Sequence, residues 1–292
     1  MRYNPFAEKI SDDEDDDQLI ETILSGSRKD LETLILRHQA WIYNIALKMV
    51  LEPRDAQDVT QEILIKMVTK LSTFNSRKGT FRTWLYRIVA NHVINMKKKK
   101  YEKVFDSGEE AHRVIDSMPD QGLEGLTDAA ILIEELKIKC WTSMLLCLDR
   151  KHRLAFILGE VFDANDQIGS EVLDISKENF RKMLSRARAK IDHFMNHNCG
   201  LIHPDNACHC SKKLKGFIAN GFIKTDRIEF YQREVDRVKA VVIENMDEFD
   251  RICSVGARRM FKEQPFYHPP FCKQWIKDTF SGPNLEGIFF HD

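Results

Sequence analysis

The sequence lacks the long apolar run and the basic, then apolar, N-terminus that mark membrane and secreted proteins. A membrane-spanning helix needs about 18 to 20 consecutive apolar residues, whereas this chain begins with the acidic stretch MRYNPFAEKISDDEDDD. A glycine-rich phosphate loop, an HExxH motif and other compact catalytic motifs are also missing. We therefore expect a cytoplasmic protein that is not an enzyme and does not insert into a membrane.

An excess of either sign of charge is missing too. The 44 Lys and Arg residues nearly balance the 45 Asp and Glu residues, which leaves a formal net charge of −1. Total charge therefore indicates no partner, and local clusters must be considered instead. With 292 residues, of which 43% are hydrophobic, the chain is long enough for two or three domains.

The seven cysteines do not resemble a disulfide framework. Cys140 and Cys147 lie in an apolar helical pattern, whereas Cys199, Cys208 and Cys210 cluster among histidines. Buried thiols plus a metal site fit this distribution better than disulfides. We expect no required cofactor, and two readings of the cluster stay open: three reduced thiols in a small apolar core, or a structural zinc ion. The candidate zinc ligands are Cys199, Cys208 and Cys210, with His197 or His203 as the fourth.

The first part of the chain predicts an acidic, flexible N-terminus at residues 1–24 and a helical domain at 25–101. Apolar residues recur every three or four positions from Leu31 to Met49, and again from Val59 to Leu71. Pro53 separates these two helices, and a break at 76–79 precedes a third amphipathic helix that starts near Phe81.

The rest of the chain predicts a linker, a second helical domain and an extension. Residues 102–130 lose the helical periodicity and are rich in Asp and Glu, which is typical of an acidic linker. Within residues 131–195 the sequence predicts a helix-turn-helix pattern. It consists of a short helix at 169–173, a turn at 174–176 and a longer basic helix capped by Ser176. Residues 196–292 form an extension with a Cys/His knot and a long amphipathic helix, whose apolar stripe runs from Ile228 to Phe249. The expected fold class is all-α.

The basic helix after the turn has two distinct faces. Phe180, Leu184, Ala187 and Ile191 form one apolar face. The opposite face carries Lys177, Asn179, Arg181, Lys182, Ser185, Arg186 and Arg188. Such a face is typical of a recognition helix, in which we expect Asn179 and Lys182 to contact base edges and the arginines to contact phosphates. The alternative is an ordinary solvated basic face.

Aromatic and basic residues are interleaved from Phe74 to Lys100. Phe81, Trp84 and Tyr86 lie among cations, an arrangement that can hold unstacked bases and single-stranded backbone. The preceding loop at 76–79 has small and basic residues and could accept a flipped base. The alternatives are that Trp84 belongs to the core and that the loop is only a turn.

These segments resemble a known family. The stretch DAQDVTQEILIKMVTKLSTFNSRKGTFRTWLYRIVANHVINMKKKK is similar to the second domain of bacterial extracytoplasmic-function sigma factors of the sigma-70 family. LLCLDRKHRLAFILGEVF followed by ISKENFRKMLSRARAKI is similar to their fourth domain. The resemblance covers roughly residues 25–195. It implies a subunit that binds core RNA polymerase and directs promoter recognition, DNA melting and transcription initiation.

The resemblance also implies roles for individual residues. The residues that would bind the clamp helices of the largest polymerase subunit are Asp55, Asp58, Gln61 and Glu62. The residues that would bind and melt the minus-10 element are Phe74, Ser76, Arg77, Lys78, Phe81, Arg82, Trp84, Arg87, Asn91, Lys97 and Lys98. The helix at 176–194 would read the minus-35 element, its domain would contact the polymerase flap region, and the acidic linker would run toward the active centre.

Two departures from the family pattern affect these expectations. Asn95 stands where family members usually carry an acidic residue, and Lys97 to Lys100 stand where they carry arginines, so point charges replace bidentate contacts. In the fourth domain, Gly169 weakens the first helix of the helix-turn-helix pattern. We therefore expect minus-35 recognition to be weaker than minus-10 recognition.

Other functions remain as alternatives. A regulator that binds duplex DNA through the helix-turn-helix without being a polymerase subunit is the main one, although the acidic helix at 55–62 and the melting segment argue against it. A metal-dependent enzyme built on the cysteine cluster is the other. The extension beyond residue 195 is expected to have a regulatory role or to bind a regulatory protein.

Overall fold

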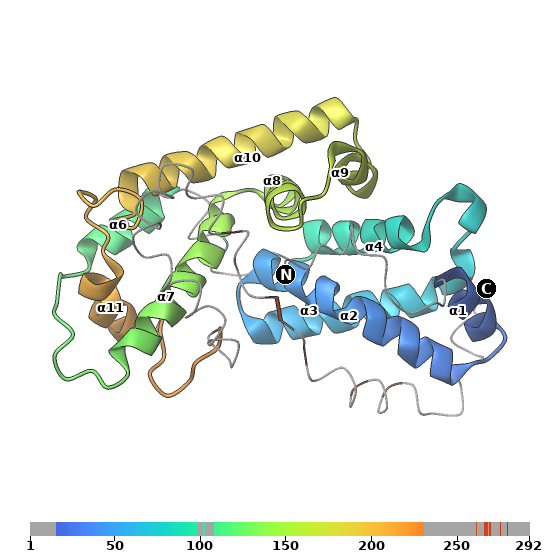
Figure 1. Ribbon diagram of the computed structural model, residues 1–292, viewed down its shortest axis with the longest axis horizontal. Helices are drawn as coiled ribbons and strands as arrows, with labels where there is room; N and C mark the ends of the chain where they lie inside the picture. The colour runs from blue at the N-terminus through green and yellow to red at the C-terminus, as the bar shows by residue number, and fades with distance from the viewer. Residues whose placement is uncertain are drawn as a thin grey trace, which may run out of the picture. The chain divides into compact units, whose positions relative to one another are not determined.

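The computed structural model describes residues 16–97, 102 and 108–230, together with 261, 266, 267, 269, 275 and 279. These residues form an all-α protein, as predicted, and contain no named strand. The chain divides into two compact units (Figure 1). Unit 1 comprises residues 1–97, 157–182 and 266–292, and unit 2 comprises residues 98–156 and 183–265. Among the described residues, none of the helices is long and apolar enough to cross a membrane.

Unit 1 begins with four helices. They are α1 (Asp16–Leu24), α2 (Arg28–Val50), α3 (Pro53–Thr69) and α4 (Phe81–Asn95). Local sequence sets their boundaries: Ser27 and Thr80 accept hydrogen bonds from the first turns of α2 and α4, and Pro53 opens α3. Short 3-10 turns at Leu71–Thr73 and Ser76–Lys78 join α3 to α4. The three-helix prediction is therefore confirmed.

The N-terminal expectation needs correction, because residues 16–24 are helical. Leu19, Ile20 and Ile23 are almost fully buried in α1. Asp16 accepts a hydrogen bond from Arg37 at 2.8 Å and lies 3.2 Å from His38 Nε2, both on α2. At the C-terminal end of the acidic run, the burial of apolar side chains therefore outweighs the repulsion among the carboxylates. Residues 1–15 lie outside the described residues.

The second part of unit 1 contains α9 (Asp166–Leu173), preceded by a π-helical turn at Ile157–Val161, and the beginning of α10 (Lys177–Asn198). Ser176 caps α10, as predicted, because its Oγ accepts a hydrogen bond from the Asn179 N–H at 3.2 Å. A Cβ built on Gly169 would lie 2.2 Å from Cζ of Phe180. Gly169 therefore provides room for a buried aromatic ring, and it is more than a weak point of the helix.

Unit 2 contains α6 (Gly108–Ser117), α7 (Ala129–Met144), a 3-10 turn at Leu145–Cys147, α8 (Arg150–Phe156), the remainder of α10, and α11 (Cys210–Ala219). Its core cluster consists of Met118, Leu132, Leu136, Leu214, Phe217 and Ile223. Met118 falls within the residues expected to form a loose linker. Gln121 N–H also donates to the Lys212 carbonyl at 2.9 Å. The linker prediction is therefore corrected for residues 108–126, which are held by packing against the extension.

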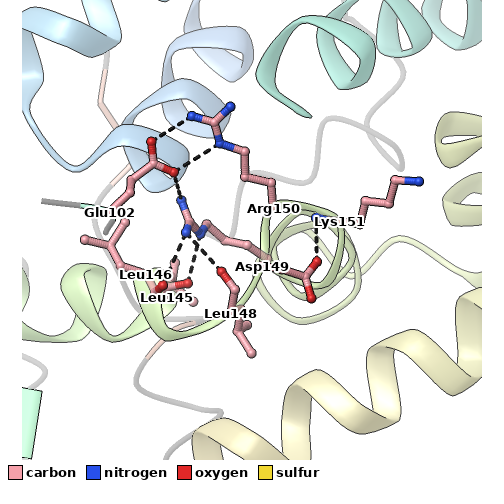
Figure 2. Close-up of polar contacts among 8 residues, drawn as sticks. Glu102, Leu145, Leu146, Leu148, Asp149, Arg150 and Lys151 are labelled. Carbon is pink, nitrogen blue, oxygen red and sulfur yellow. Dashed lines mark hydrogen bonds and ion pairs between the residues drawn. The ribbon is translucent and has the colours of Figure 1, made fainter. Parts of the chain in front are cut away.

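Glu102 is a second correction to the linker prediction. Its side chain is 1% exposed and accepts hydrogen bonds from Arg150 Nη2 at 2.7 Å and Arg153 Nη1 at 3.2 Å. Figure 2 shows Glu102 opposite the Arg150 guanidinium, with the carbonyl-bearing residues 145, 146 and 148 nearby. Arg153 also donates to the carbonyls of Leu145 and Leu148. This buried network fixes Glu102 to the start of α8.

The extension is part of unit 2 as far as residue 230. The Glu135 carboxylate on α7 accepts hydrogen bonds from the backbone N–H groups of Glu229 and Phe230 at 3.0 to 3.1 Å. Lys139, also on α7, forms an ion pair with Glu229 at 3.2 Å. Because all four residues are nearly buried, these contacts exclude water and hold the segment in place. The rest of the predicted apolar stripe, from Tyr231 to Phe249, lies outside the described residues.

Candidate nucleic-acid and polymerase interface

The acidic face of α3 is accessible at the surface of unit 1. Asp58 and Glu62 are exposed, and Asp55 and Gln61 are half-buried. The opposite face of the helix packs into the core through residues such as Ile63, Leu64 and Met67. These four residues therefore have the exposure required of a surface that contacts another protein.

The same face of α3 includes an apolar residue that the sequence reasoning missed. Ile65 is 42% exposed, one turn beyond Gln61 and Glu62. At a protein interface, an exposed apolar side chain can supply apolar burial beside the charge complementarity that carboxylates supply. The signal was present in the sequence, because Ile65 falls outside the buried series Val59, Ile63 and Met67.

The Glu62 carboxylate contacts another helix of unit 1. Its carboxylate lies 3.3 Å from His92 Nε2 on α4, and His92 Nδ1 accepts a hydrogen bond from Lys66 at 2.6 Å. Burial and the Lys66 ammonium lower the pKa of His92, which favours the neutral ring. The Glu62 carboxylate is therefore an exposed group that also contacts α4.

The loop before α4 exposes all of its predicted contact residues. Ser76, Arg77 and Lys78 form an exposed 3-10 turn, which Asn75 caps by accepting a hydrogen bond from the Arg77 N–H at 3.0 Å. Gly79 adopts a φ of 151°, a conformation that residues with a side chain rarely adopt. The loop is thus a defined turn with two exposed cations.

The aromatic residues of this region divide into core and surface. Phe81 is 2% exposed and Tyr86 is 3% exposed, so both belong to the core in this conformation. Helix periodicity turns both rings inward, and their contact with bases stays a prediction that their burial does not support. Trp84 is half-buried, and its ring stacks on Phe81 with centroids 5.4 Å apart. Phe74 completes the group, 5.8 Å from Trp84.

The remaining predicted contacts of this region differ in their availability. Arg82 is half-buried, whereas Asn91 and Lys97 are exposed and Lys98 lies outside the described residues. Arg87 is exposed, and its Nε donates a hydrogen bond to the carbonyl of Glu171 at 3.0 Å. Only a nucleic-acid contact through the Arg87 Nε would therefore require this bond to break first, because the guanidinium has further N–H donors.

The predicted recognition helix, α10, presents its two faces as expected. Phe180, Leu184, Ala187 and Ile191 are buried. The exposed residues of the other face are Lys177, Asn179, Arg181, Lys182, Ser185 and Arg186, and Arg188 is half-buried. Arg181 pairs with Asp166 at 3.0 Å and Lys182 pairs with Glu178 at 2.6 Å, but both pairs are exposed and weak. These cations can therefore exchange their partners for phosphates.

The cysteine cluster involves one more residue than predicted. A β-bridge joins Cys199 to Cys208, and Cys140 on α7 lies close enough to Cys199, Cys208 and Cys210 to interact with them electrostatically. Burial raises the pKa of Cys208 and of Cys210 to about 12, so both are neutral thiols. Within the described part of the chain, no group of three or more Cys, His, Asp or Glu residues is arranged to hold a metal ion. The candidate ligands His197 and His203 do not complete such a group, and the zinc prediction has no support.

Comparisons with known proteins find similarity to RNA polymerase sigma factors. Residues 34–102 match the family described as Sigma-70 region 2. The RNA polymerase sigma-H factor of Pseudomonas aeruginosa is 37% identical over 82 residues, which is 28% of this chain and 42% of that protein. The match thus spans less than half of that relative. The ECF RNA polymerase sigma-E factor of Escherichia coli K12 is 26% identical over 179 residues, which is 61% of this chain and 92% of the relative. A solved structure, described as CnrH in complex with the cytosolic domain of CnrY, matches with a TM-score of 0.42 and 19% identity, over 62% of this chain and 97% of that one.

Proposed function

We propose that this chain, which belongs to the sigma-70 family as a sigma factor of the extracytoplasmic-function type, directs core RNA polymerase to promoters and opens the DNA there. The observation that carries this proposal lies in unit 1. An exposed carboxylate face on α3 and an exposed basic loop before α4 occur together in the segment that matches the family.

Polymerase binding is assigned to α3. Asp58 and Glu62 provide exposed negative charge, and Ile65 provides an exposed apolar anchor on the same helix. Charge complementarity with a basic partner would steer association and set register, while burial of Ile65 would slow dissociation. We therefore expect Asp55, Asp58, Gln61, Glu62 and Ile65 to form one contact surface.

Promoter melting is assigned to the loop at 75–80 and to the exposed part of α4. Arg77 and Lys78 can neutralise phosphates beside a displaced base, and the half-buried Trp84 is the ring best placed to stack on it. Stacking on an aromatic side chain contributes roughly 1 to 3 kcal/mol per base, which is comparable to the cost of unstacking that base. Binding energy can therefore drive melting without catalysis.

Recognition of the minus-35 element is assigned to the exposed face of α10. A helix with one buried apolar face and one exposed basic face suits the major groove. The Gly169 and Phe180 contact keeps α9 packed on α10 despite the departure from the family pattern. The role of the extension is assigned separately: residues 199–230 stabilise unit 2, and the residues after 230 are proposed to bind a regulatory protein.

Reconstitution with core RNA polymerase tests the proposal. The purified chain should co-elute with core polymerase in gel filtration, and Asp58→Lys should weaken this association at least tenfold. Glu21→Lys, an equal charge reversal at an exposed position on α1, is the matched control and should bind like the unaltered chain. Failure of the unaltered chain to co-elute, together with specific binding to duplex DNA alone, would instead support the regulator that acts without polymerase.

A further inference from the structure

Unit 2 contains a cavity of about 210 Å³ that the proposed function does not use. It lies among α6, α7, α10 and α11, and its main apolar lining comes from Ile115, Met118, Met144, Phe194, Phe217 and Phe222. An apolar cavity of about 150 Å³ can stay dry and bind benzene. The volume in unit 2 is therefore sufficient for one substituted ring or a small bicyclic molecule, and too small for a helix from another protein.

The described part of the cavity wall carries no charge. None of the described residues that line it is Asp, Glu, Lys, Arg or His. Cys140 and Cys147 contribute thiols, and burial raises the pKa of both, so that they remain neutral. A charged ligand would lose its hydration without gaining a counter-ion, which excludes carboxylates, phosphates and amines.

Two polar side chains define how a ligand could hydrogen-bond. Ser143 Oγ donates to the carbonyl of Lys139 at 2.6 Å, and Asn220 Nδ2 donates to the carbonyl of Gly216 at 2.9 Å. These bonds use the Ser143 hydroxyl and one of the two N–H groups of Asn220, and they leave an oxygen on each side chain that can accept a hydrogen bond. Asn220 and Val114 are exposed and therefore mark the mouth of the cavity.

We infer that this cavity is a binding site for a compact, neutral, largely apolar molecule with a single hydrogen-bond donor. Indole has this chemistry and an appropriate size. Residues of α6, α7, α10 and α11 all contribute to the lining. An occupant would therefore contact four separate helical segments. Occupancy is therefore expected to stabilise unit 2 by mass action. This inference does not rest on the proposed function.

The test uses the full chain labelled with ¹³C at its methionine methyl groups, with indole as the probe. The signals of Met118 and Met144, which line the cavity, should shift in a saturable manner. The signals of Met49 and Met67, which are fully buried in unit 1, should not shift. Benzoate, a carboxylate of similar size, should leave all four signals unchanged. Unchanged Met118 and Met144 signals with indole, or equal shifts of Met49 and Met67, would overturn the inference.

A variant at the mouth provides a second, independent test. Val114→Trp should lower indole affinity at least tenfold, because Val114 is 39% exposed and tolerates a larger side chain that fills the cavity. Ile65→Trp, at a comparably exposed site on α3, should bind indole like the unaltered chain. Undiminished binding by Val114→Trp would refute the assignment, as would binding that occurs only after residues 231–292 are removed. The measurement involves neither polymerase nor DNA, so its failure is distinguishable from failure of the proposed function.

Discussion

Glu102 and Arg150 form a buried ion pair, with Glu102 Oε1 and Arg150 Nη2 separated by 2.7 Å. Arg153 makes a second contact with the same carboxylate at 3.2 Å. Glu102 is the last residue of the segment that matches Sigma-70 region 2, whereas both arginines belong to α8. The pair therefore joins the end of the segment that matches Sigma-70 region 2 to a helix that lies nearly fifty residues later.

Glu102→Ala is expected to destabilise the protein by roughly 3 to 5 kcal/mol, because two buried guanidinium groups lose their counter-ion. Urea unfolding followed by circular dichroism measures the change. Glu178→Ala is the control: it removes an ion pair with Lys182 in which both side chains are more than half exposed, and it should change stability by less than about 1 kcal/mol. Equal effects of the two substitutions would contradict the buried network.

Gly169→Ala should destabilise unit 1 although alanine is the better helix former by about 1 kcal/mol. The added methyl group would collide with the Phe180 ring, and overpacking of this kind typically costs about 1 to 3 kcal/mol. The same substitution combined with Phe180→Leu should recover part of the loss in a double-mutant cycle. A stabilised Gly169→Ala protein would show that the glycine serves only as a weak point in the helix.

The buried Lys48 on α2 should make the stability of the folded protein depend on pH. Burial lowers its pKa from 10.5 to about 8 in the folded chain. Between these values the unfolded chain binds a proton that the folded chain does not, so the destabilisation due to Lys48 shrinks as the pH rises. Lys48→Met should therefore raise stability at neutral pH by about 3 kcal/mol, since each pKa unit corresponds to about 1.4 kcal/mol.

The pH test compares Lys48→Met with the unaltered chain by urea unfolding from neutral pH to about pH 10.5. The advantage of the variant should decline steadily above about pH 8. Lys70→Met, at an exposed position, should show no such trend. A constant difference between Lys48→Met and the unaltered chain would mean that Lys48 is charged when folded.

Ile65→Ser should weaken the association with core polymerase without lowering the melting temperature appreciably. The side chain is 42% exposed, so its removal affects the free protein little, whereas an anchor at an interface can contribute more than 1 kcal/mol. Lys70→Ser, at the exposed residue that follows the C-terminal end of α3, is the control. Unchanged affinity of Ile65→Ser would remove this residue from the proposed surface.

Much of the fold followed from local patterns. Periodicity predicted α2, α3 and α4, and the capping role of Ser176 and the buried face of α10 were confirmed because both depend on residues within a few positions of one another. Glu102 and Met118 were assigned to a linker because the segment is acidic in composition. Composition gives no information about contacts with residues that are distant in sequence. Likewise, the aromatic segment could not be divided into buried Phe81 and accessible Trp84, since their spacing allows either to face the core.

Transcription by the reconstituted holoenzyme is the direct test of whether this chain initiates transcription. Core RNA polymerase and the full chain are incubated with linear genomic fragments, and the transcript start sites are mapped. We expect transcripts that start at discrete sites and that require the chain. Double substitution of Arg77 and Lys78 by alanine should abolish these transcripts while leaving co-elution with core intact. Absence of chain-dependent transcripts from every fragment would show that the chain is not an initiation factor, and full activity of the Arg77 and Lys78 variant would show that the loop does not open DNA.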